Sequence, residues 1–187
     1  MEKKISVKVL TLLGFGVALN IVGAFIALTL RLPIYIDSVG TIMIACLLGP
    51  KYAVITGVCG SLVSGMTFDV YSLYFAPVQI STGLLAGMMY KKGLLSGVKT
   101  PLGVLIFALP TSILSSIIAA IVFGGVTSSG SSYIVQVLKV LGVGDVASVF
   151  IVQFFTDYAD KFVAVALVGL GVNAIPKSIR VSMTAQK

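Results

Sequence analysis

The sequence contains no histidine and no tryptophan, and only two of its 187 residues are cysteine. Histidine is the side chain most used for acid–base catalysis near neutral pH and for binding transition metals. Cys46 and Cys59 lie within apolar runs, without the spacing of a metal site, so we interpret them as small packing residues. A GxxxxGK[ST] phosphate loop and a recognisable nucleophile–base pair are also missing. The sequence therefore predicts no enzyme activity, no metal and no cofactor, and leaves any ATP hydrolysis to partner subunits.

Charged residues are scarce as well. They make up 10% of the chain, whereas an average soluble domain has about 25%. Hydrophobic residues make up 58% of the chain, and the mean hydropathy is +1.12. These values predict an all-α integral membrane protein with one membrane domain over residues 1–187. The net charge of +7 does not indicate nucleic-acid binding, because the basic residues flank apolar runs, as expected for a membrane protein.

The apolar runs predict the positions of the helices. We expect six membrane helices over about residues 7–30, 37–48, 52–65, 75–90, 101–123 and 158–174, and a short surface helix over about 133–141. The first run is longer than the apolar core of a signal peptide, which has about 7–15 residues, so we keep it as a membrane helix. Pro110 is expected to interrupt the fifth helix, and the glycine- and serine-rich residues 124–132 to form a flexible turn.

The apolar residues 146–155 are too short to cross a membrane alone. They either fold back into the protein or begin one long final helix. We favour a break after them, because the sequence TDYAD over residues 156–160 is typical of a helix start with acidic residues in its first turn. A long final helix would place residues 157–161 deeper in the protein.

A topology with both chain ends in the cytoplasm fits the charge distribution. It leaves ten of the thirteen lysine and arginine residues inside, and only Arg31, Lys139 and Lys161 outside. Because lysine and arginine accumulate in cytoplasmic loops, this bias supports the orientation. Five of the six acidic residues fall outside, so polar side chains are expected to gather on the outer face.

The outer ends of the predicted helices carry aromatic and ionisable side chains. A small-molecule pocket combines aromatic walls with a few polar groups, and ionisable residues at membrane depth are usually functional. Taken singly, these residues could instead be helix caps, a local ion pair involving Asp157, and interfacial aromatics. The candidate substrate-binding residues are Arg31, Tyr35, Asp37, Asp69, Tyr71, Tyr74, Gln79, Tyr158, Asp160 and Lys161.

Small residues recur at helical spacing in the first helix. Gly16, Asn20 and Ala24 form one row, and Gly23 and Ala27 form another. Such faces allow two helices to approach closely. The partner is either another part of this chain or a separate docking subunit.

Several stretches together resemble a known family. They are ALNIVGA at residues 18–24, LPIYIDSVGT at 32–41 leading to LLGP at 47–50, and Asp160-Lys161 with the closing IPK at 175–177. They resemble the substrate-binding S components of energy-coupling factor (ECF) transporters, which import vitamins into bacteria and some archaea. The resemblance implies a multi-pass cell-membrane protein that binds a vitamin or precursor from outside. It also implies docking of the first helix on a membrane coupling subunit (the T component), which is driven by two ATPases.

The substrate is a narrower expectation. Relatives with this first-loop pattern handle flavin, pyridoxine-like, pyrimidine-like and corrinoid compounds, so the resemblance implies a pyridoxine-, hydroxymethylpyrimidine- or riboflavin-like substrate. Tyrosines suit stacking on a flat ring, and the excess of outer acids argues against a polyanion. The alternatives are a self-sufficient secondary carrier or channel, and a membrane assembly factor without a ligand.

Overall fold

The computed structural model of the protein describes residues 6–174, and every regular element in this part of the chain is a helix. The prediction of an all-α protein is therefore confirmed for these residues, whereas the motif at residues 175–177 lies outside them. The elements are α1 (Val7–Thr29), α2 (Val39–Leu47), α3 (Pro50–Thr67), α4 (Tyr71–Tyr74), α5 (Ala76–Lys91), η1 (Gly97–Lys99), α6 (Thr100–Phe123), α7 (Ser131–Val140) and α8 (Asp145–Ala174).

Proline and glycine mark several helix ends. Pro50, Pro77 and Pro101 lie in the first turns of α3, α5 and α6, where the missing N–H costs nothing. Gly124 ends α6 with a φ of 59°, a left-handed conformation that favours glycine. Pro110 lies inside α6, but the helix continues through it, contrary to the expected interruption.

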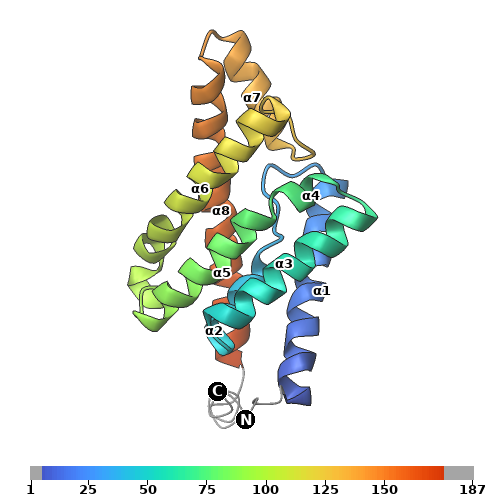
Figure 1. Ribbon diagram of the computed structural model, residues 1–187. Coiled ribbons are helices and arrows are strands. Elements are labelled where there is room, and N and C mark those ends of the chain that lie inside the picture. Colours follow the sequence, from blue (N-terminus) through green and yellow to red (C-terminus); the bar gives the residue numbers. More distant parts are fainter. Residues whose placement is uncertain (1–5, 175–187) are drawn as a thin grey trace.

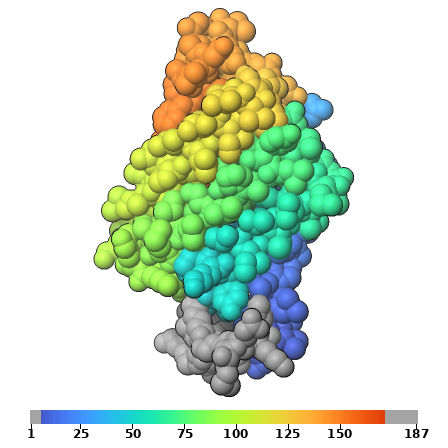
Figure 2. Space-filling model, in the orientation of Figure 1, coloured from blue at the N-terminus to red at the C-terminus, as the bar shows by residue number. Residues whose placement is uncertain are grey.

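The helices form an elongated bundle. The start of α1 and the end of α8 lie at one end of the molecule, and α7 with the start of α8 projects at the other (Figure 1). Helices α3, α5 and α6 lie side by side across one face (Figure 2). Helix α2 packs against α1, α3, α5 and α8, and its Ile42 and Ile44 are fully buried.

Within residues 6–174, two segments are long and apolar enough to cross a membrane: α1 and the continuous stretch Gly97–Phe123. Both carry many exposed apolar side chains, including Phe15, Phe25 and Ile113. With nine residues, α2 covers about 14 Å, less than half of a membrane core of about 30 Å.

The last helix is continuous from Asp145 to Ala174, so the expected break before residue 158 is wrong. The hydroxyl of Thr156 donates to the carbonyl of Val152 at 2.8 Å, within the helix, and does not cap a new one. Asp157 and Asp160 bind groups on other segments instead of backbone N–H groups of a first turn. Tertiary contacts thus account for the acidic residues that resembled a helix start.

The row of small residues on α1 packs against this chain itself. Gly16, Asn20, Ala24 and Ala27 are buried, and a Cβ added to Gly23 would overlap the backbone carbonyl of Ile36. Of the two interpretations of this face, packing within the chain is the one that the structure matches. A partner subunit that docks on α1 would have to use other residues.

Asn20 caps α2 from the neighbouring helix. Its Oδ1 accepts hydrogen bonds from the backbone N–H groups of Gly40 at 2.8 Å and Thr41 at 3.2 Å, and its Nδ2 donates to Thr41 Oγ1 at 2.8 Å. These two N–H groups lie in the first turn of α2, where no intrahelical acceptor is available. The residue preceding α2, Ser38, makes no side-chain capping bond of its own. The buried Asn20 therefore performs this role.

Replacing Asn20 with alanine should destabilise the protein by about 2–4 kcal/mol, because it leaves two buried N–H groups without an acceptor. The measurement is the thermal unfolding midpoint of the detergent-solubilised protein. Thr11→Ala, which removes an exposed hydroxyl from the same helix, should change stability by less than about 0.5 kcal/mol. Equal effects of the two substitutions would contradict the capping role.

Candidate functional site

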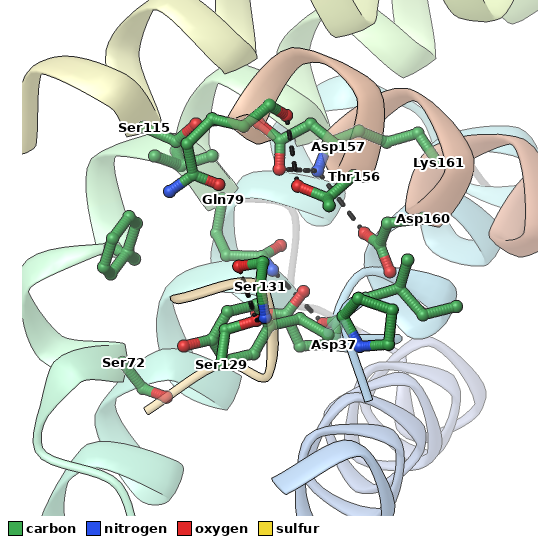
Figure 3. Close-up of a pocket in the computed structure, with 16 residues that line it drawn as sticks. Asp37, Ser72, Gln79, Ser115, Ser129, Ser131, Thr156, Asp157, Asp160 and Lys161 are labelled. Carbon is green, nitrogen blue, oxygen red and sulfur yellow. Dashed lines mark hydrogen bonds and ion pairs between the residues drawn. The ribbon is translucent and has the colours of Figure 1, made fainter. Parts of the chain in front are cut away.

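A cavity lies where the α1–α2 loop, the start of α5, the last turns of α6, the α6–α7 loop and the middle of α8 meet (Figure 3). It encloses about 570 Å³ of empty space, including the part open to the outside. The lining residues are Pro33, Ile34, Tyr35, Asp37, Ser72, Phe75, Val78, Gln79, Ser115, Ser129, Ser131, Gln153, Thr156, Asp157, Asp160 and Lys161.

One wall of the cavity is a buried ion cluster on α8. Lys161 Nζ lies 3.4 Å from Asp160 Oδ2 and 3.8 Å from Asp157 Oδ1. The side chains of Lys161 and Asp160 are each only 4% exposed. Asp157 also accepts a hydrogen bond of 2.8 Å from Ser115 Oγ on α6. A buried charge without an opposite charge beside it is costly. The carboxylates of Asp157 and Asp160 and the ammonium group of Lys161 therefore stabilise one another.

Asp160 also fixes the conformation of the α1–α2 loop. Its carboxylate accepts hydrogen bonds from the Ile36 backbone N–H at 2.6 Å and from Ser38 Oγ at 3.1 Å. Ile36 has a φ of 52°, which is unusual for a β-branched residue and needs external support. The contact from α8 therefore holds the loop in the shape that brings Asp37 to the cavity.

The opposite side of the loop is held by Gln79 of α5. Its Nε2 donates to the backbone carbonyl of Asp37 at 3.2 Å, and its Oε1 accepts from Thr41 Oγ1 at 3.0 Å. Thr41 in turn bonds to Asn20. A continuous buried network thus links α1, α2 and α5 to the cavity wall.

The serine-rich segment after α6 closes another side. The hydroxyls of Tyr35 and Ser128 lie 2.9 Å apart, at hydrogen-bond distance, and Gly130 N–H donates to the Leu32 carbonyl at 3.1 Å. A Cβ at Gly130 would overlap the carbonyl oxygen of Arg31, so this approach requires glycine. The segment expected to be a flexible turn therefore has specific contacts with the α1–α2 loop.

Half of the predicted substrate-binding residues meet at this cavity. They come from three of the predicted segments: the first loop, the fourth helix and the last helix. These residues are Tyr35, Asp37, Gln79, Asp160 and Lys161.

The other five lie elsewhere. Arg31 is exposed and donates to Tyr133 Oη at 2.9 Å, beside a separate hollow under α7. Tyr71 and Tyr74 pack on Phe123, with ring centroids 4.7 Å and 5.1 Å away.

Asp69 and Tyr158 likewise point to other groups. Asp69 is buried, and its carboxylate accepts a hydrogen bond of 3.0 Å from the hydroxyl of Ser72. Tyr158 stacks on Phe162 and donates to the Pro101 carbonyl at 3.4 Å. None of the five is among the residues lining the cavity.

Sequence reasoning missed several lining residues. Gln153 falls in the apolar residues 146–155, which the expected helix break would have separated from the last helix, and Thr156 was interpreted only as part of a helix start. Ser115 has no local signal, because its partner Asp157 is 42 positions away. Ser129 and Ser131 belong to the segment interpreted as a flexible turn. Asp157 was recognised only as a possible local ion-pair partner.

The chemistry of the lining residues suits binding. They combine an ion cluster, amide and hydroxyl groups, and an apolar side formed by Phe75 and Val78. Within residues 6–174, no group of three or more histidine, cysteine or acidic residues has the geometry to hold a metal ion. Comparisons with protein-family models, curated proteins and solved structures give no match for this chain.

Proposed function

We propose that the protein is a membrane-embedded binding subunit for a small molecule, of the same type as the S components of ECF transporters. The cavity carries this proposal, because buried polar groups and an apolar wall converge around it, as in small-molecule sites. No nucleophile–base pair or nucleotide loop accompanies the cavity, so we propose binding without enzymatic activity. Partner ATPases would then supply the energy for import.

The proposed topology has six membrane helices, α1, α2, α3, α5, α6 and α8, with both chain ends in the cytoplasm of a bacterial or archaeal cell. Helix α2 is too short to cross alone, so the non-helical residues 32–38 would complete its crossing. Non-helical backbone at membrane depth is tolerated where protein buries it. Here the bonds from Asp160 and Gln79 to this segment supply partners for its polar groups.

The proposed partner is a membrane coupling subunit that binds α1. Because the small-residue face of α1 is buried, we propose that the coupling subunit binds the outward face, which exposes Phe15, Val22 and Phe25. The proposed substrate is a vitamin or vitamin precursor with a flat ring, of pyridoxine, hydroxymethylpyrimidine or riboflavin type.

The direct test is mass spectrometry of small molecules that co-purify with the detergent-solubilised protein. One stoichiometric vitamin-like compound would support the proposal and name the substrate. A protein that carries nothing, and that binds nothing from a panel of vitamins, would overturn it. Gradient-driven flux through liposomes containing this chain alone would instead support a self-sufficient carrier.

A matched pair of glutamine substitutions tests the site itself. Gln153 lines the cavity, and its side chain makes no hydrogen bond to another described residue. Gln153→Ala should therefore weaken binding of the co-purified compound about tenfold, the value of one lost hydrogen bond, without loss of stability. Gln136→Ala, on the exposed side of α7, should leave the affinity unchanged in the same equilibrium measurement. Equal affinities of both variants would remove the cavity from the binding site.

A further inference from the structure

The charges around the cavity do not balance. Asp37, Asp157 and Asp160 line it, and Lys161 is the only lysine or arginine among its lining residues. The nearby Arg31 is turned to the exposed hydroxyl of Tyr133. With all groups ionised, three negative charges face one positive charge.

The three carboxylates differ in how they are paired. Asp157 and Asp160 each lie within 4.0 Å of Lys161 and accept further hydrogen bonds from protein groups. Asp37 has no lysine or arginine within this distance among residues 6–174. The Gln79 amide donates to the backbone carbonyl of Asp37. Asp37 is thus the carboxylate whose charge the protein leaves unmatched.

An unmatched carboxylate in a partly enclosed cavity is costly, and a proton or a bound cation can remove the cost. An anionic ligand would add a further negative charge beside three carboxylates. A cationic ligand would instead neutralise the excess.

The rest of the lining limits the shape of such a ligand. Pro33, Ile34, Phe75 and Val78 form an apolar side, and among them Phe75 is aromatic, a side chain that suits contact with a flat ring. Gln153 adds an amide that can donate to and accept from the ligand. A hydrated inorganic ion would gain nothing from the apolar side.

We propose that the cavity binds an organic cation, a flat and mainly apolar molecule with one positively charged nitrogen that pairs with Asp37. This inference rests on the proposed binding function, and among the proposed substrates it favours rings with a basic nitrogen over the uncharged ring of riboflavin. It predicts that the cavity binds cationic rings that contain nitrogen more tightly than neutral rings. It also predicts weak binding of phosphorylated compounds, which carry the opposite charge.

Three probes of nearly identical shape test the charge preference: benzamidine, which is cationic, benzamide, which is neutral, and benzoate, which is anionic. Their affinities for the full chain in detergent can be measured by calorimetry or ligand-observed NMR at pH 8. We expect benzamidine to bind at least tenfold more tightly than benzamide, and benzoate to bind most weakly. Asp37→Asn should abolish the preference, whereas Asp145→Asn, which changes an exposed acid outside the cavity, should preserve it.

The outcomes separate this inference from the proposed function. Equal affinities for the three probes, no binding of any of them, or a preference for benzoate would overturn the cationic ligand. A neutral or anionic compound that co-purifies would overturn it too, while leaving the binding function in place. The binding function fails only if the protein neither co-purifies with a small molecule nor binds one from the vitamin panel.

Discussion

Replacing Lys161 with methionine is expected to prevent stable folding. The substitution keeps most of the side-chain volume but leaves Asp157 and Asp160 without their cation in a buried environment. Breaking a buried ion pair in this way costs about 3–5 kcal/mol, a large share of a total stability of about 5–15 kcal/mol. The expected result is little monodisperse protein in size-exclusion chromatography, and a strongly lowered unfolding midpoint for any that is recovered.

Two further variants test whether unpaired charge causes the instability of Lys161→Met. Combining Lys161→Met with Asp157→Asn and Asp160→Asn removes all three charges, so it should restore most of the lost stability. Lys139→Met breaks an exposed pair with Asp145, whose side chain is 81% exposed, and should cost less than about 1 kcal/mol. If the triple variant is as unstable as Lys161→Met alone, the charge explanation is wrong and lost packing accounts for the effect.

A side chain at Gly40 is expected to separate α1 from α2. A Cβ at this position would overlap the carbonyl oxygen and carbon of Gly16, which are backbone atoms and cannot rotate away. Overpacking typically costs about 1–3 kcal/mol and more where the backbone must move. Gly40→Ala should therefore lower the unfolding midpoint by several degrees, and Gly40→Val should leave no folded protein. The shift would also displace Asn20, which lies one turn from Gly16 and caps α2.

Gly14 is the matched control for this prediction. It lies on the same helix, but a Cβ added there meets no atom within 4 Å. Gly14→Ala should stabilise the protein by about 0.5–1 kcal/mol, because alanine is the better helix former. A Gly40→Ala protein as stable as Gly14→Ala would show that the close crossing of α1 and α2 does not occur.

Much of the helical framework could be predicted from the sequence, because helix position depends on local patterns. The long apolar runs match α1 and α6 closely, and the prolines at residues 50, 77 and 101 lie where helices begin. The predicted start of the final helix was wrong because acidic residues at this point have two possible explanations, a helix start or distant partners. Local sequence cannot distinguish them.

Half of the predicted substrate-binding residues line the cavity, again because local sequence shows unusual residues but not their distant partners. The sequence marks Asp37, Gln79, Asp160 and Lys161 as polar groups in apolar surroundings, which is unusual enough to indicate a function. It gives no indication that Arg31, Tyr71 and Tyr74 turn toward other surface groups. Nor does it select Ser115 and Gln153 from many similar residues.

The sequence by itself determined that the chain is all-helical and apolar, where most of its helices begin and end, and that its few charges are exceptional. Only the tertiary structure decided which partner each of these groups has. Asp160 and Ile36 are 124 positions apart and share a hydrogen bond, and the small-residue face of α1 packs on its own chain. The physical reason is that helix formation follows bonds between near neighbours, whereas pairing and burial depend on which distant segments the fold brings together.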